Sequence, residues 1–138
     1  LAETVNNDLA KGAYVAKTES SDSIDLILMA SGSELELAVE TAKNLEADGK
    51  SVRVVSMPSA TLFEEQSAEY KESILPSAIS SRFAIDSGPS MSWYRYIGLQ
   101  GGHHCLDRFG ECGPGETVAK HFGYTTEALT AKVSDYLA

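Results

Sequence analysis

The sequence has few of the features that mark secreted, membrane-bound or nucleic-acid-binding proteins. Its 2 cysteines among 138 residues are too few for a disulfide framework, and no charged-then-apolar signal pattern opens it. The longest apolar run, Leu26–Ala30, is far too short to span a bilayer. The 11 Lys and Arg residues are scattered among 20 Asp and Glu, and a net charge of −9 repels nucleic acid and anionic lipid. We therefore expect a cytoplasmic protein that binds neither nucleic acid nor membranes.

Motifs for phosphate binding and catalysis are also absent. Neither G-x-G-x-x-G nor G-x-x-x-x-G-K-[ST] occurs, and no Ser/His/Asp order or paired-carboxylate spacing indicates a catalytic site. The length suits one domain with its own core. Because the chain starts at Leu1 with a polar, weakly patterned stretch, we expect residues 1–11 to be an interdomain linker remnant and residues 12–138 to form a single α/β domain.

The sequence does contain an alternation of strand and helix patterns. Strands are predicted at 12–19, 24–32, 51–57, 82–88 and 103–110. The segment 24–32, "IDLILMASG", is almost continuously apolar, which indicates a strand buried on both faces, as in a parallel sheet. The segment 12–19 alternates like a short edge strand. Strands that alternate with helices favour an α/β fold, here a mostly parallel sheet of about five strands flanked by helices.

Helices are predicted between and after these strands. The first has its apolar face at Leu35, Ala38, Ala42 and Leu45. Ser33 and Glu36 are expected to form a capping box at its start, and Gly49 to end it. One or two short helices are expected over 61–76 and another over 115–123. The last helix, over 125–138, has an apolar stripe at Leu129, Val133 and Leu137.

Two glycine-containing turns are candidate anion sites. Gly32 and Ser33 lie between a strand end and a helix start, where phosphates bind in open α/β sheets. A plain capping turn accounts for the same residues, so phosphate is expected to bind there no more tightly than about millimolar. The second turn, "GECGPGE", has three glycines (Gly110, Gly113 and Gly115), but Glu111 and Glu116 would repel an anion, which favours a sharp strand-to-helix turn.

The stretch "GGHHCLDRFGECGPGE" groups several potential metal ligands: His103, His104, Cys105, Glu111 and Cys112. On a strand, His103 and Cys105 point to one face and His104 and Leu106 to the other, so the ligands are divided. Six residues separate the two cysteines, which is outside the usual zinc spacing, and His121 could join only through tertiary folding. We expect no stoichiometric zinc. Cys112 has no recognisable residue to orient a catalytic base.

An aromatic segment, "SWYRYIG", combines Trp93, Tyr94 and Tyr96 with Arg95. Such a set can stack a ligand or anchor an interface. In so acidic a chain, core packing or a subunit contact is the favoured interpretation.

The order of several segments resembles one enzyme family. The stretch "ASGSELELAVETAKNLEADGKSVRVVSMPS", followed by "FEEQSAEYKESILP", closely resembles the C-terminal domain of transketolases. "RFAIDSG", "WYRYIG", "DRFGECGPGE" and "FGYTTEALTAKVSDYL" match later family segments in order, from about Lys11 to the end. The resemblance implies that domain's three-layer sandwich. The chain departs from the family at His103, His104 and Cys105, where apolar or small residues are usual, and at Cys112 and Gly113, where Ser-Ala is frequent.

The resemblance also implies a function that belongs to a longer protein. Transketolases, enzymes of the pentose phosphate pathway, move a two-carbon ketol unit between ketose and aldose phosphates, using thiamine diphosphate and a divalent metal, magnesium or calcium. The cofactor lies between two upstream domains, across a homodimer interface. The C-terminal domain carries none of the family's established catalytic or cofactor-binding residues, so no catalytic, cofactor or metal residue is assigned here. The resemblance therefore predicts a structural, interface-forming domain that is inactive alone, with the upstream domains and a second subunit as partners.

Alternatives stay open on the sequence. Dihydroxyacetone synthase, pyruvate dehydrogenase beta subunits and deoxyxylulose phosphate synthase share this domain, although "VVSMPS" with "YKESILP" favours transketolase. A small-anion or nucleotide-binding regulatory module would use the crevice near Gly32 and Gly113. A metal-binding protein would use His103, His104, Cys105 and Cys112.

Overall fold

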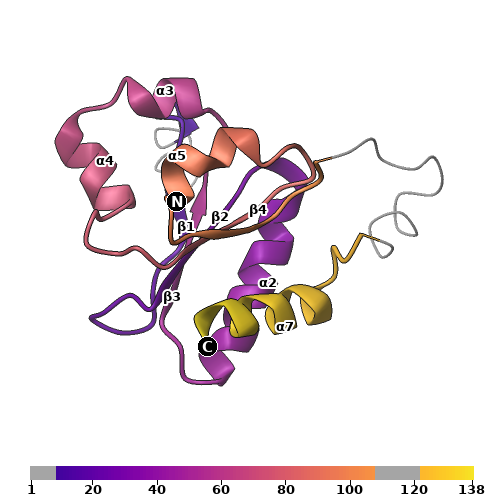
Figure 1. Ribbon diagram of the computed structural model, residues 1–138. Coiled ribbons are helices and arrows are strands. Elements are labelled where there is room, and N and C mark those ends of the chain that lie inside the picture. The colour runs from indigo at the N-terminus through magenta and orange to yellow at the C-terminus, as the bar shows by residue number, and fades with distance from the viewer. Residues whose placement is uncertain (1–8, 108–121) are drawn as a thin grey trace.

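The computed structural model describes residues 9–107 and 122–138, which contain one five-stranded sheet (Figure 1). Its strands are β1 (Tyr14–Lys17), β2 (Leu26–Ala30), β3 (Val52–Ser56), β4 (Arg82–Ile85) and β5 (Gly102–His104), in the order β1-β3-β2-β4-β5. The strands from β2 to β5 are parallel, and β1 pairs antiparallel with β3 at one edge. The predicted mostly parallel sheet and the edge position of the first strand are confirmed.

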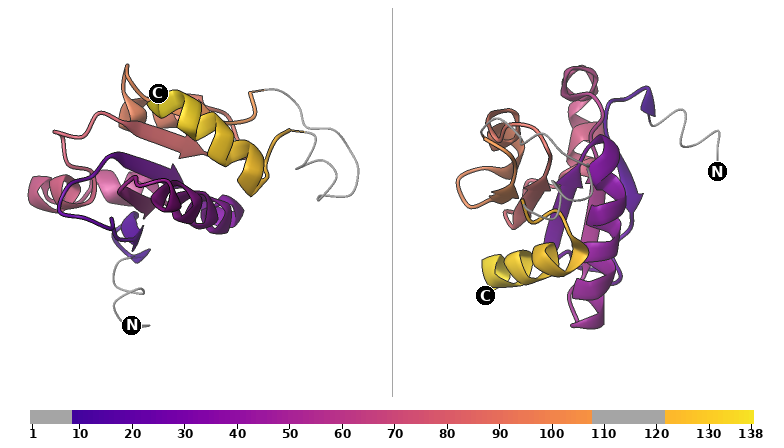
Figure 2. Two further views of the ribbon diagram at one scale, coloured as in Figure 1. Left: turned by 90° about the horizontal axis from the view of Figure 1, so that it is seen from below. Right: turned by 90° about the vertical axis from the view of Figure 1, so that its right-hand side faces the viewer.

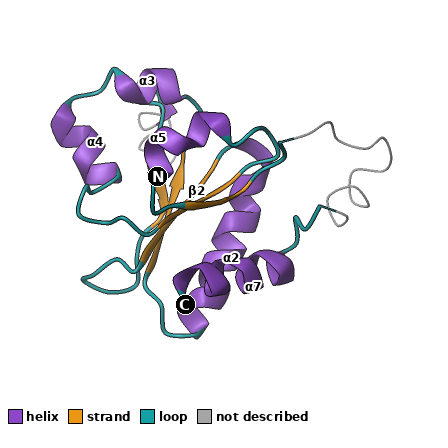
Figure 3. Ribbon diagram, in the orientation of Figure 1, coloured by secondary structure: helices purple, strands orange, loops and turns teal. Residues whose placement is uncertain are grey.

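Helices cover both faces of this sheet, and Figure 3 shows the strands between two groups of them. One face carries α2 (Leu35–Ala47) and α7 (Thr126–Leu137), which pack against each other as well as on the sheet. The other face carries α3 (Ala60–Glu64), α4 (Ala68–Ile74), the 3₁₀ turn η2 (Met91–Trp93) and α5 (Tyr94–Ile97). The views in Figure 2 show the resulting layers. None of the helices in residues 9–107 and 122–138 is long and apolar enough to cross a membrane.

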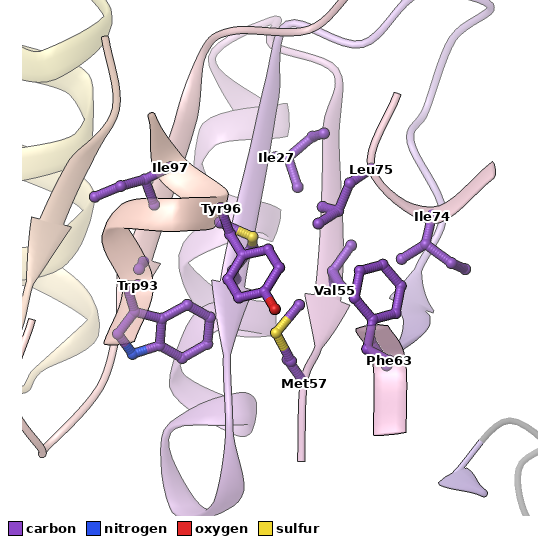
Figure 4. Close-up of a cluster of buried hydrophobic side chains, with 12 residues drawn as sticks. Ile27, Val55, Met57, Phe63, Ile74, Leu75, Trp93, Tyr96 and Ile97 are labelled. Carbon is purple, nitrogen blue, oxygen red and sulfur yellow. The ribbon is translucent and has the colours of Figure 1, made fainter. Parts of the chain in front are cut away.

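The central strand β2 is buried along its whole length, as its continuous apolarity predicted. Ile27 and Met29 join the cluster under α3, α4 and α5, which Figure 4 shows with Phe63, Trp93 and Tyr96 around it. The alternate residues of β2 join a second cluster with Ala38, Ala42, Leu45, Leu129 and Val133 of the helices α2 and α7. This division follows from the two-residue period of a strand. Each face of the sheet therefore has its own apolar core.

The predicted capping box at Ser33 and Glu36 is wrong. A 3₁₀ turn, η1 (Gly32–Glu34), precedes α2, so Ser33 lies inside a helical turn and cannot act as its N-cap. The residue at the N-cap position, Glu34, has helical backbone angles and makes no side-chain cap hydrogen bond. The Ser33 hydroxyl instead donates to the Glu34 carboxylate at 3.0 Å. The predicted end of the helix is confirmed, since Gly49 has a φ of +89° just beyond α2.

The strand predicted at 103–110 is shorter, covering Gly102–His104. Its partner β4 ends at Ile85, which pairs with His104, so the ladder stops there. The chain then follows the loop after β4, where the Leu106 amide donates to the Gly88 carbonyl at 2.9 Å. The stretch 61–76 forms two short helices, within the expected range. The helix predicted over 115–123 lies almost wholly outside the described residues.

Candidate functional site

The carboxyl ends of the parallel strands share one edge of the sheet, where open α/β folds bind ligands. The turn after β2 contributes Gly32 and Ser33 to this edge. Three carboxylates stand beside that turn. Glu34, Glu36 and Glu40 line a hollow of about 400 Å³ together with Ser33, Leu37, Tyr124 and Thr126. Negative charge at this position repels phosphate, so the geometry disfavours the anion-binding interpretation of this turn.

A polar network follows β4 and fastens the segment before α7 to the sheet. The Trp93 indole donates to the Asp86 carboxylate at 2.8 Å, and the Tyr124 hydroxyl donates to the Asp86 carbonyl at 2.5 Å. Burial and nearby acidic groups raise the pKa of Tyr124 to about 12, so it stays protonated and remains a donor. Asp86 therefore joins the segment after β4 to Tyr124, which lies 38 residues further along the chain.

Ser90, His103 and Asp107 come close together, but their connections do not form a catalytic triad. The Asp107 carboxylate accepts hydrogen bonds from the Ser90 amide at 2.7 Å and from the Ser90 hydroxyl at 2.8 Å. These bonds lower the pKa of Asp107. The His103 ring contacts Tyr94, with Nε2 3.5 Å from the hydroxyl oxygen. Because the serine proton is held by a carboxylate and not by a histidine, the group lacks the nucleophile–base pair of a hydrolase. It fixes a loop.

The two neighbouring histidines lie on opposite faces of the sheet, as predicted. His103 pairs with Ala84 and lies on the α5 face, where Cys105 also packs. His104 pairs with Ile85 and lies on the α7 face, in edge contact with the ring of Tyr124 at 4.6 Å between centroids. Within residues 9–107 and 122–138, no three His, Cys, Asp or Glu side chains are placed to hold a metal ion. Glu111, Cys112 and His121 lie outside these residues.

His104 is held as a neutral ring by two partners. Its Nε2–H donates to the Phe122 carbonyl at 2.7 Å, and its Nδ1 accepts from the Lys132 ammonium at 3.0 Å. Burial and the positive charge of Lys132 lower the pKa of His104. The ring therefore connects β5 to Phe122, which precedes α7, and to Lys132 within α7. No sequence pattern indicates this role, because Lys132 lies 28 residues further along the chain.

Cys105 is not activated as a nucleophile. Burial, with the charges of Asp86 and Asp107, raises the pKa of its thiol to about 11.

The aromatic segment is mostly structural. Trp93 and Tyr96 are buried in the core, and the ring of Tyr96 makes an edge contact with that of Phe63, with 6.1 Å between the centroids. Tyr94 and Arg95 of the same segment are exposed. The packing interpretation thus holds for the two buried rings. The turn "GECGPGE" lies outside the described residues.

The fold and this edge define an open α/β domain whose polar side chains at the carboxyl edge hold its own loops. Residues 12–125 match the family model of the transketolase-like C-terminal domain. The chain belongs to that family. Over 131 residues it is 45% identical to the transketolase of Staphylococcus epidermidis and 46% identical to transketolase 1 of Aliivibrio fischeri, covering 95% of this chain and 20% of each relative.

The solved structures agree. A mutant transketolase from Pichia stipitis matches 95% of this chain and 18% of its own with a TM-score of 0.84 and 31% sequence identity. The three-layer sandwich implied by the resemblance is thereby confirmed. The chain spans about a fifth of the length of the curated relatives.

Proposed function

We propose that this chain serves as the structural C-terminal domain of a transketolase that transfers two-carbon ketol units between ketose and aldose phosphates. The observation that carries the proposal is the 45% identity to a transketolase over nearly the whole chain. In the proposed enzyme, residues 1–11 are the end of an interdomain linker and residues 12–138 are one domain. Its partners are the upstream domains and a second subunit of a homodimer, in the cytoplasm.

The described residues do not fit thiamine diphosphate. A divalent metal that holds a diphosphate needs converging carboxylate and amide oxygens, and no such group of three acidic or His/Cys side chains occurs in residues 9–107 and 122–138. The carboxyl-edge hollow faces Glu34, Glu36 and Glu40, which would repel the diphosphate. Both observations on residues 9–107 and 122–138 support a cofactor site elsewhere in the longer enzyme.

The domain contributes a folded body whose polar side chains at the carboxyl edge bind its own loops. The loops at the carboxyl edge are held by hydrogen bonds to Asp86, Asp107 and His104, and these bonds fix the shape of that edge. A body of this kind can position neighbouring domains without taking part in the chemistry.

A chimera tests the proposal. The C-terminal fifth of the Staphylococcus epidermidis transketolase is replaced by residues 12–138, and ketol transfer from xylulose 5-phosphate to ribose 5-phosphate is assayed with thiamine diphosphate and magnesium. We expect the chimera to keep at least about a tenth of the parent's rate, because the replaced domain touches no reacting atom. A parent enzyme truncated before this domain is the control. A folded, dimeric chimera without activity would contradict the proposal.

A further inference from the structure

Two arginines occupy equivalent positions on the sheet but have different partners. Arg53 of β3 and Arg82 of β4 both pair in register with Ile27 of β2, so their side chains leave the same face. Arg53 makes a two-pronged ion pair with the Glu19 carboxylate, at 2.7 and 2.8 Å, and lowers the pKa of Glu19. It also donates to the carbonyls of Ser73 and Ile74. Its positive charge is therefore balanced.

Arg82 makes no such ion pair with a carboxylate of the described residues. Its guanidinium donates to the carbonyls of Ile79, Tyr96 and Pro76, each at 2.8 Å, and to that of Leu75 at 3.4 Å. No carboxylate of the described residues lies within salt-bridge distance. The nearby Glu72 carboxylate is engaged by the amide and hydroxyl of Ser77, both at 2.8 Å. Burial lowers the pKa of Arg82 and the negative charge of Glu72 acts in the opposite direction, so this half-buried cation has a carboxylate nearby but forms no ion pair with it.

Arg82 lines a hollow of about 420 Å³ at the amino ends of β4 and β5. Its polar lining residues are Ser77, Ser80, Arg82, Arg95 and Gln100, and no carboxylate lines it. Within the described residues, the Ser80 hydroxyl and the Gln100 carboxamide make no hydrogen bond to the protein. Leu99 is fully exposed at the rim. In a chain of net charge −9, a carboxylate-free hollow with two guanidinium groups is an unusual local environment.

We propose that this hollow binds the phosphate group of a small organic phosphate. The guanidinium groups of Arg82 and Arg95 supply positive charge that attracts an anion, and the unpaired donors of Ser80 and Gln100 can complete its hydrogen bonds. Leu99 and Ile79 offer apolar contact to the carbon skeleton. The site is distinct from the carboxyl-edge hollow, which has a similar volume but three glutamates. The inference holds whether or not the longer protein transfers ketol units.

Arg95 provides the means to test it, because it is exposed and its removal leaves the core intact. Its Nη2 lies 2.9 Å from the Glu64 carboxylate, which competes with any bound anion. Replacing Arg95 by Gln removes one positive charge from the hollow. Replacing Glu64 by Gln removes the competitor. The two substitutions should therefore change phosphate affinity in opposite directions.

The measurement is a titration of the full chain with inorganic phosphate, in which NMR monitors the backbone amide chemical shifts. Sodium chloride at matched ionic strength is the reference. We expect saturable shifts at Ser80, Leu99 and Gln100, with a dissociation constant of about 1–10 mM. Arg95→Gln should weaken binding about fivefold, and Glu64→Gln should tighten it about twofold. Lys43→Gln, which removes a positive charge from the exposed side of α2, is the matched control and should leave the affinity unchanged.

Three results would overturn the proposal. The first is the absence of any shift beyond that of chloride. The second is equal affinity in the wild-type chain and Arg95→Gln. The third is saturable shifts confined to residues 32–37 at the carboxyl edge. Glycerol 3-phosphate in place of inorganic phosphate should bind more tightly and extend the shifts to Ile79, and failure to do so would contradict the organic part of the ligand.

Discussion

The two ends of the sheet hold their loops with different chemistry. At the carboxyl end, Asp107 and His104 bind loop amides, carbonyls and Lys132 through groups that titrate in or near the acidic range. At the amino end, Arg82 binds four carbonyls through a guanidinium that stays charged at any ordinary pH. The contacts of Asp107 and His104 are therefore sensitive to pH, whereas those of Arg82 depend on a permanent charge.

The largest expected effect comes from removing the charge at the amino end. Arg82→Met should lower the free energy of unfolding by about 3 kcal/mol, because several half-buried carbonyls lose their donor together. Arg82→Lys should recover less than half of that loss, since a single ammonium, with three donors on one nitrogen, cannot bind four separate carbonyls. Urea unfolding at neutral pH measures both. Equal stability of the Lys variant and the wild-type chain would show that charge alone, without the planar fork, holds these loops.

The second effect concerns the thiol at the carboxyl end. With its pKa raised to about 11, Cys105 has little thiolate near neutral pH. We expect iodoacetamide to modify it roughly 100-fold more slowly in the native chain than in the urea-unfolded chain. Mass spectrometry of the peptide that contains Cys105 gives both rates. A native rate within tenfold of the unfolded rate would indicate an accessible, reactive thiol.

The smallest effect is the pH response of His104. Because the folded state lowers its pKa, the unfolded chain binds more protons as the pH falls below the ordinary value of about 6.5. The contribution of the neutral His104 ring to the free energy of unfolding is intact above that value, and it is lost as the pH falls toward the folded-state pKa. Between about pH 7.5 and 5.5 the loss should not exceed about 1 kcal/mol, because the ring is only half-buried and solvent screens its charge.

Variants identify the source of this response. In His104→Gln the dependence on pH over this interval should shrink. Lys132→Met should shrink it partly, because removal of the neighbouring positive charge raises the pKa of His104. Urea unfolding at both pH values gives the comparison. An undiminished pH dependence in His104→Gln would assign it to other groups.

The sheet could be predicted from the sequence because apolar continuity and alternation report burial directly. β2 is buried on both faces as its composition indicated, and the register that separates His103 from His104 follows from the strand period alone. The prediction of a capping box was wrong because the S-x-x-E pattern does not specify the backbone conformation of the residues before it. Gly32, with a φ of +59°, starts a 3₁₀ turn that moves Ser33 out of the capping position.

The polar contacts were less predictable for a physical reason. Arg82 binds main-chain carbonyls, which every residue has, so no sequence pattern marks its partners. His104 and Lys132 meet only after α7 packs across the sheet. The same limit explains why the hollow at Arg82 and Arg95 was missed, since its lining comes from the loop before β4 and the segment before β5.

The central claim is that this domain contributes structure and leaves the chemistry to the rest of the proposed enzyme. The most direct measurement adds thiamine diphosphate, magnesium, xylulose 5-phosphate and ribose 5-phosphate to the purified 138-residue chain. The account predicts ketol transfer no faster than without protein, and no thiamine diphosphate binding by calorimetry. Transfer above the protein-free rate that disappears when the cofactor is omitted would contradict it.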